Sequence, residues 1–161
     1  MTVGAPAPVV PSRRGAVLLL ALHWAPAALT MAIIWILSSM SHPPIDVSSL
    51  PFRDRGAHFL SFGSVAFWVA HGTMATVPRA HAIRVVCFAV LAAALWGLLD
   101  EIHQTFVPGR SPDIVDLFAD TLGAILGASL RAMARLVWPR TPGAQSGGAG
   151  SSGPDPQEVA T

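Results

Sequence analysis

Side chains that could bind a ligand or move a proton are concentrated in three short polar segments of an otherwise apolar chain: 54–58, 100–104, and 109–113 with the following Asp116 and Asp120. Carboxylates and imidazoles act as general acids and bases, and arginines bind phosphate or carboxylate groups. The candidate binding residues in these segments are Asp54, Arg55, His58, Glu101, Gln104, Arg110, Asp113, Asp116 and Asp120. If the fold brings the three segments together, they form a polar site that contains both signs of charge.

Helical spacing places several of these residues on shared faces. Asp54 and His58 are four residues apart, so they lie on one helix face. Asp113, Asp116 and Asp120 follow a three-then-four spacing and form one polar stripe. Asp120 lies about 10 Å along the helix axis from Asp113 at 1.5 Å per residue. An ionised carboxylate at that depth in a bilayer costs roughly 2.5–3.5 kcal/mol. We therefore expect Asp120 to face the protein interior, pair with an arginine or be protonated.

Two adjacent acids, Asp100 and Glu101, end the third apolar run. Acids at a helix C-terminus oppose the helix dipole, and such a conflict is typical of a site with another purpose. Arg55 and Arg110 are the available partners, so one interpretation is an interhelical salt bridge. The other is a ligand or catalytic site that uses Glu101. Asp100 points about 100° away from Glu101 on a helix and is expected at the wet rim.

Two residues are candidates for a general base, Glu101 and His58, because Asp54 could hold the tautomer of His58. The chain offers no serine or cysteine nucleophile motif. A His/Glu/Asp metal site is conceivable, but no tight ligand pair such as His-x-x-x-His supports it, so we predict no metal and no cofactor. A single cysteine, Cys87, excludes an internal disulfide and a Cys-based zinc site.

Composition indicates that lipid surrounds much of the chain. Hydrophobic residues make up 52% of the chain and charged residues 12%, and its mean hydropathy is +0.54. A soluble domain carries about 25% charged residues. A span needs about 20 apolar residues. The four runs that predict an all-α membrane bundle are 15–37, 56–77, 83–99 and 112–137. The net charge of +1, without a basic stripe, excludes nucleic acid as a partner.

The four spans also predict topology and domain limits. Seven arginines fall on the side of the two termini and three on the other, which predicts cytoplasmic termini. Alternation of the spans then brings the three polar segments to the outer face. The transmembrane domain covers 15–138, between a disordered N-terminus, 1–14, and a disordered Pro/Gly/Ser-rich tail, 139–161. A cleaved signal peptide is the alternative for the first run, but its apolar pattern continues ten residues beyond the small-residue motif 25–27, which favours an uncleaved anchor.

Two features predict details of the fourth helix. Ser111 followed by Pro112 is typical of a helix start, with Pro at the first helical position. Asp113 would then lie near the positive end of the helix, where an acid is favourable, so it serves either as a cap or in the site. Gly123 and Gly127 form a Gly-x-x-x-Gly pattern that allows close packing of two helices.

These residues resemble the VanZ-like family of small bacterial membrane proteins. The resemblance runs from about Trp35 to Gly127 and includes the ordered pattern Glu-x-x-Gln-x-Phe-x-x-Gly-Arg-x-x-Asp-x-x-Asp. The segments that carry it are 38–39, 54–59, 101–106, 109–113 and 116–127. The chain departs from the family pattern at Arg55, where Lys is usual, and at Asp120, where Asn is usual.

The resemblance implies a multi-pass protein of the bacterial cytoplasmic membrane whose partners are membrane lipid and a lipid-linked cell-wall precursor. The namesake is linked to resistance to teicoplanin, and no agreed biochemical activity comes with the family. Three hypotheses follow: a protein that binds or modifies a lipid-linked or wall-linked substrate at the outer face, a membrane-embedded enzyme, or a structural protein whose polar cluster is an interhelical network. The sequence leaves the oligomeric state open.

Overall fold

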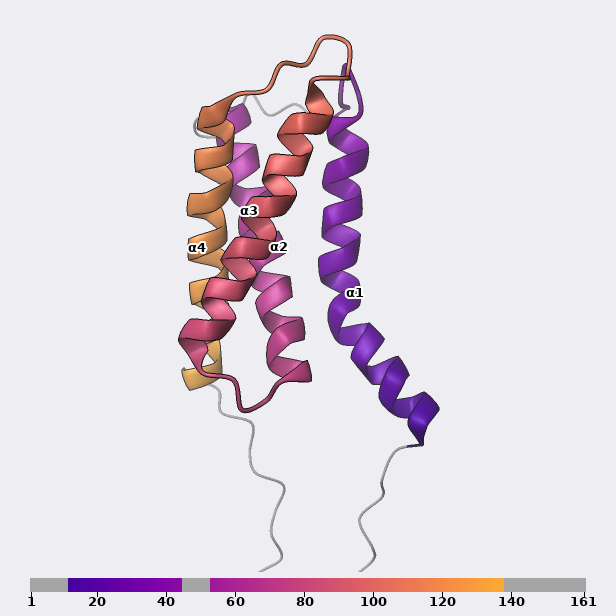
Figure 1. Ribbon diagram of the computed structural model, residues 1–161, viewed down its shortest axis with the longest axis vertical. Helices are drawn as coiled ribbons and strands as arrows, with labels where there is room; N and C mark the ends of the chain where they lie inside the picture. The colour runs from indigo at the N-terminus through magenta and orange to yellow at the C-terminus, as the bar shows by residue number, and fades with distance from the viewer. Residues whose placement is uncertain (1–11, 45–52, 138–161) are drawn as a thin grey trace, which may run out of the picture.

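A computed structural model describes residues 12–44 and 53–137, which fold into four helices without a strand (Figure 1). The helices are α1 (Arg13–Ser38), α2 (Asp54–Thr76), α3 (Ala82–Gln104) and α4 (Ile114–Val137). The predicted all-α fold is confirmed. The segments expected to be disordered, 1–14 and 139–161, fall outside the described residues except for 12–14, and residues 45–52 of the first loop are also outside them.

Successive helices run antiparallel, which sorts their ends into two groups (Figure 1). The end of α1, the start of α2, the end of α3 and the start of α4 meet at one end, here called the polar end. The start of α1, the α2–α3 turn and the end of α4 lie at the opposite end, here called the arginine end. The three polar segments therefore share one end of the bundle, as the alternation of spans predicted.

Three helices, α1, α3 and α4, are long and apolar enough to cross a membrane. Helix α2 has a similar length of 23 residues but is less apolar. It packs against all three of the others and most extensively against α4, whereas α1 and α3 touch little. Because α2 is surrounded by protein more than the other helices are, it needs less apolar surface toward lipid.

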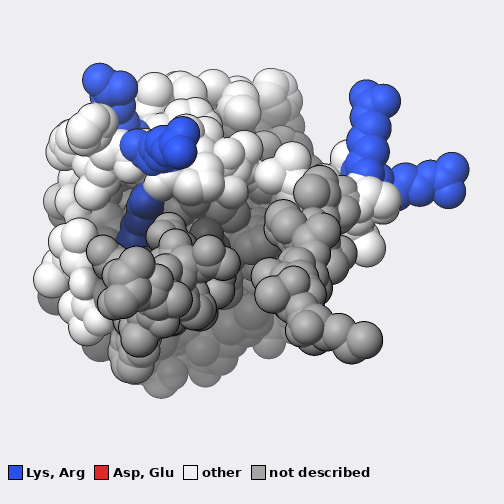
Figure 2. Space-filling model, turned by 90° about the horizontal axis from the view of Figure 1, so that it is seen from below, with Lys and Arg blue, Asp and Glu red and all other residues white. Residues whose placement is uncertain are grey.

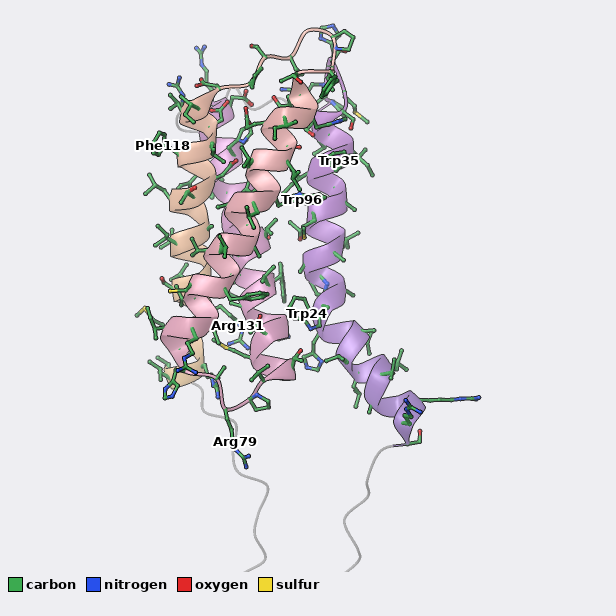
Figure 3. The ribbon with its side chains drawn as sticks, in the orientation of Figure 1. Trp24, Trp35, Arg79, Trp96, Phe118 and Arg131 are labelled. Carbon is green, nitrogen blue, oxygen red and sulfur yellow. The ribbon has the colours of Figure 1, made fainter. Side chains whose placement is uncertain are left out.

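Small residues make up most of the interior of the bundle, beside Phe62, Met74 and a few valines, and most large apolar residues face outward. The buried alanines are Ala27, Ala66, Ala70, Ala89, Ala93, Ala124, Ala128 and Ala132. Phe118 points away from the bundle and is 65% exposed (Figure 3). This arrangement is typical of helices that pack closely within lipid, which solvates large apolar side chains as well as the protein interior does.

The glycine pattern on α4 forms the contact with α2. A Cβ added at Gly123 would collide with the carbonyl oxygen of Phe59, and one added at Gly127 would collide with that of Gly63. The two backbones are therefore in direct contact, as the Gly-x-x-x-Gly spacing predicted. This contact fixes the position of α4, and with it the acids of its first two turns, relative to α2.

Helix α1 bends near Pro26, and its first half leans away from the bundle (Figure 1). Proline lacks the N–H of the helical ladder and clashes with the preceding turn, which accounts for the bend. The second half packs beside α2 and α3, where the rings of Trp35 and Trp96 lie 5.5 Å apart (Figure 3). The small-residue motif 25–27 lies inside this continuous helix.

Charge is divided between the two ends of the bundle. Viewed from below, the arginine end shows arginine side chains and no acid among the described residues (Figure 2). Arg79 and Arg131 lie toward this end (Figure 3). All described acids belong to the polar half of the bundle: Asp54, Asp100, Glu101, Asp113, Asp116 and Asp120.

Some helix boundaries differ from the expected ones. Helix α1 begins at Arg13, and α3 continues through Gln104. The predicted start of the fourth helix is wrong, since Pro112 lies outside α4. Instead Asp113 precedes the helix, and its Oδ1 accepts the Val115 N–H at 2.8 Å. An aspartate cap satisfies a free N–H and also complements the helix dipole, so it defines the start better than the Ser-Pro pair.

Candidate functional site

Asp100 is the most deeply buried acid at the end of α3, with 1% of its surface exposed. Its Oδ1 accepts a 2.5 Å hydrogen bond from Ser38 Oγ, and its Oδ2 accepts a 3.0 Å bond from Gln104 Nε2. Gln104 follows Asp100 by four residues, one helical turn later. The expected position of Asp100 at the wet rim is therefore wrong, because the end of α1 covers this face of α3.

Glu101, 6% exposed, joins the end of α3 to the start of α4. Its Oε2 accepts the backbone N–H of Asp113 at 2.8 Å, while its Oε1 is buried without a hydrogen-bond partner among the described residues. The Asp113 N–H is one of the donors that the start of a helix leaves free. Glu101 thus stabilises the start of α4 with one oxygen and leaves the other available.

A histidine–aspartate pair, His58 and Asp120, joins α2 to α4. His58 Nδ1 donates a 3.0 Å hydrogen bond to Oδ1 of Asp120, which is fully buried. The second oxygen of Asp120 has no hydrogen-bond partner within the described residues. A Cβ added at Gly97 would lie 2.6 Å from this oxygen, so the glycine of α3 makes room for the carboxylate. Asp120, rather than Asp54, is therefore the residue that orients His58.

Arg55 forms the exposed rim of the site. Its guanidinium lies 3.5 Å from Oδ2 of Asp113 and 3.9 Å from Oδ1 of Asp116. The Arg55 side chain is 55% exposed, and water weakens such pairs to about 0–1 kcal/mol. The described ion pairs of Arg55 are with Asp113 and Asp116, so the interpretation in which Arg55 bridges to Asp100 or Glu101 is not supported.

Arg110 belongs to the α3–α4 connection, which turns at Gly109 with a φ of +79°. This left-handed backbone is accessible to glycine without strain. The turn directs Arg110 toward α1, where its Nε donates to the Met40 carbonyl oxygen at 3.2 Å. Arg110 also does not pair with the acids of α3 among the described contacts, and it instead ties the connection to the segment after α1.

A pocket of about 330 Å³ lies between the polar ends of α1, α2 and α3. Its polar lining residues are Ser38, Asp54, His58, Ser61, Asp100, Gln104 and Arg110. Its apolar lining residues are Ile34, Leu37, Pro43, Ala57, Leu60 and Phe62. Leu60 is 58% exposed on the outer surface of α2, so one wall of the pocket adjoins the surface that faces lipid. The pocket therefore combines a polar end with an apolar side.

A model of the VanZ/LLP1 family matches residues 24–135, most of the four-helix domain. The chain belongs to this family. No curated protein and no solved structure matches the chain. The match contains every predicted site residue and all of α2, α3 and the pocket lining.

The predicted site residues of this VanZ/LLP1 protein divide into two groups. Four of them line the pocket: Asp54, His58, Gln104 and Arg110. The other five lie beside it, on the side of α4: Arg55, Glu101, Asp113, Asp116 and Asp120. His58 is the link, because it lines the pocket and also bonds to Asp120.

Among the polar residues that line the pocket, sequence reasoning missed three: Ser38, Ser61 and Asp100. Ser38 belongs to the Ser-Ser pair that carried part of the resemblance, but a serine after an apolar run has no spacing pattern that predicts its partner. Asp100 gave a signal in its conflict with the helix dipole. The conflict was attributed to Glu101 instead. Helical spacing gives the angle between two adjacent acids, but it does not tell which of them a neighbouring helix covers.

Proposed function

We propose that this VanZ/LLP1 protein lies in the bacterial cytoplasmic membrane with its polar end outward. The division of charge supports this orientation, since the arginine end shows arginines and no described acid (Figure 2), and the described acids all belong to the polar half. Cytoplasmic loops carry the excess of arginine and lysine in membrane proteins. The pocket then opens on the side of the cell wall, and both termini lie in the cytoplasm.

In that position the protein binds a lipid-linked or wall-linked substrate that carries an anionic group. The observation that carries this proposal is the pocket itself, which adjoins the lipid-facing surface at Leu60 and contains Arg110 at its polar end. An apolar chain fits the side of the pocket that adjoins the lipid-facing surface, and a phosphate or carboxylate group fits the guanidinium of Arg110. Polyprenyl-phosphate-linked wall precursors combine both features in one molecule.

Asp100 and Gln104 orient the polar part of such a substrate. Their mutual bond and the Ser38 bond hold them in one geometry before any ligand arrives. Preorganised polar groups of this kind confer specificity because they need no rearrangement. A protein that holds a wall precursor at the outer face would also change susceptibility to glycopeptides such as teicoplanin, which attack those precursors.

The test measures which lipid copurifies with the protein from its native membrane, and how much of it. We expect mass spectrometry to detect a polyprenyl-phosphate lipid with wild type and at least tenfold less with Arg110→Ala. Arg79→Ala is the matched control, since Arg79 is an exposed arginine in the α2–α3 turn at the opposite end. Equal amounts of this lipid in all three preparations would contradict the proposal.

Enzymatic modification of the substrate is a second candidate function, favoured by the His58–Asp120 pair. A histidine that lines a pocket and is held by a buried carboxylate has the arrangement of a general base. Glu101 does not line the pocket, so of the two candidates His58 is better placed. If the protein is an enzyme, His58→Gln abolishes product formation from the copurified lipid while lipid binding remains. Unchanged turnover would exclude this function for His58.

A further inference from the structure

Three ligand-type side chains from three helices converge beside the pocket. One ligand atom each from His58 of α2, Glu101 of α3 and Asp120 of α4 lie within 4.8 Å of one another. We propose that these three residues bind a divalent first-row transition-metal cation, such as Zn²⁺ or Mn²⁺. This inference goes beyond the proposed function and does not depend on it, because metal binding can be measured without any lipid.

Unpartnered oxygens in the cluster are the independent observation that points to a cation. Glu101 and Asp120 are 6% and 0% exposed, and each has one buried oxygen without a hydrogen-bond partner in the described parts of the chain. An ionised carboxylate away from water is costly unless a positive charge or donors surround it. His58 is the only described ion-pair partner of either acid. Two buried carboxylates around one imidazole leave a deficit of positive charge that a divalent cation removes.

The geometry and chemistry of the donor atoms also fit. His58 Nδ1 and Asp120 Oδ1 are 3.0 Å apart. Two ligands each about 2.1 Å from one ion are themselves about 3.0 Å apart at an octahedral angle and about 3.4 Å apart at a tetrahedral one, so an ion can replace the proton between them with little movement of the side chains. An imidazole with two carboxylates is a mixed N/O donor set, which suits zinc and manganese better than a pure oxygen set does. Three protein ligands leave a position open for water or for a substrate oxygen.

A second grouping, Asp54, His58 and Asp116, shares the same histidine. It is the weaker of the two, because Asp54 is exposed and Arg55 lies 3.9 Å from the Asp116 carboxylate. A fixed positive charge beside Asp116 competes with a metal ion there. The cluster of His58, Glu101 and Asp120 is deeper and has no arginine in contact among the described ion pairs.

The test uses full-length protein with a tag that lacks histidine, stripped with EDTA and titrated with Zn²⁺ or Mn²⁺ in calorimetry. We expect one ion per chain, with binding at least tenfold weaker in His58→Gln and Glu101→Gln. His103→Gln is the matched control, because His103 lies at the same end but bonds to Ser39 and stacks on Trp35. This control should bind as wild type does.

A spectroscopic measurement on wild type keeps the proposal testable if a variant fails to fold. Spin-echo modulation of bound Mn²⁺, with ¹⁵N-histidine in the protein, should detect one coordinated imidazole nitrogen. The proposal is overturned if wild type takes up neither ion, if no imidazole nitrogen is coordinated, or if His58→Gln and Glu101→Gln bind as wild type does. Metal binding without copurified lipid would support this site and count only against the proposed function.

Discussion

Ser38, the last residue of α1, donates a 2.5 Å hydrogen bond to the buried carboxylate of Asp100 on α3. Both residues line the pocket, and both are at most 7% exposed. Together with the Ser39–His103 hydrogen bond and the stacking of Trp35 on His103, this bond holds the end of α1 against α3 beside the pocket. Of these contacts, the Ser38 bond is the one made inside the pocket lining.

Removal of that hydroxyl should loosen the site. Ser38→Ala leaves Asp100 with Gln104 as its remaining described partner, and a hydrogen bond to a charged group contributes about 1.5–3 kcal/mol. We expect a lower midpoint of thermal unfolding in detergent. Ser39→Ala is the control, since the exposed Ser39 bonds to the Trp35 carbonyl oxygen and to His103. Identical midpoints for the two variants would show that the Ser38 bond contributes nothing to stability.

The contact of α4 with α2 should not tolerate a methyl group. In Gly127→Ala the new Cβ meets the carbonyl oxygen of Gly63, so the helices must separate. Overpacking of this kind costs about 1–3 kcal/mol. The expected result is a lower yield of monodisperse protein in size-exclusion chromatography. Leu126→Ala removes a side chain that is 47% exposed and should leave the yield near wild type. A full yield of Gly127→Ala would contradict the close contact.

The convergence of the polar segments could be predicted from sequence, because it follows from the alternation of antiparallel spans. Apolar run lengths set the four helices, and connectivity then places the start of one beside the end of the next. The Gly123 and Gly127 contact could also be predicted, because only small residues allow backbones to touch. These inferences need only spacing and residue type.

The choice of partners within the cluster could not be predicted. One interpretation paired Arg55 and Arg110 with Asp100 and Glu101. Instead, neutral donors bond to both oxygens of Asp100, and a backbone N–H bonds to one oxygen of Glu101. Consecutive residues on a helix differ by about 100° in direction. Small rotations of each helix therefore decide which acid is covered, and the sequence does not specify those rotations.

Glu101→Gln separates a working site from an architectural network. The amide oxygen of glutamine can still accept the Asp113 N–H, so the start of α4 keeps its bond. We expect a folded yield in detergent close to that of wild type. Glu101→Leu, which cannot accept this bond, should lower the yield because it leaves a buried donor unpaired. If Glu101→Gln unfolds as readily as Glu101→Leu, the negative charge itself holds the bundle together.

The orientation of the protein can be measured with single cysteines. In a Cys87→Ala background, Ser111→Cys places a thiol at the polar end and Arg79→Cys places one at the arginine end. We expect a membrane-impermeant maleimide to label only Ser111→Cys in intact cells. After permeabilisation, both should react. Labelling of Arg79→Cys alone in intact cells would reverse the topology and put the pocket in the cytoplasm.

Drug susceptibility in the native host tests the role of the outer site. The gene is deleted and then restored as wild type, Arg110→Ala, Glu101→Gln or the control Arg79→Ala, with membrane levels matched by blotting. We expect wild type and Arg79→Ala to restore the wild-type profile against teicoplanin, vancomycin and detergents. Arg110→Ala and Glu101→Gln should each fail, because the first loses the guanidinium of the pocket and the second loses a carboxylate of the proposed cation site. Full restoration by both would mean that neither the guanidinium of Arg110 nor the carboxylate of Glu101 is needed for function, so the polar end would be architectural or dispensable.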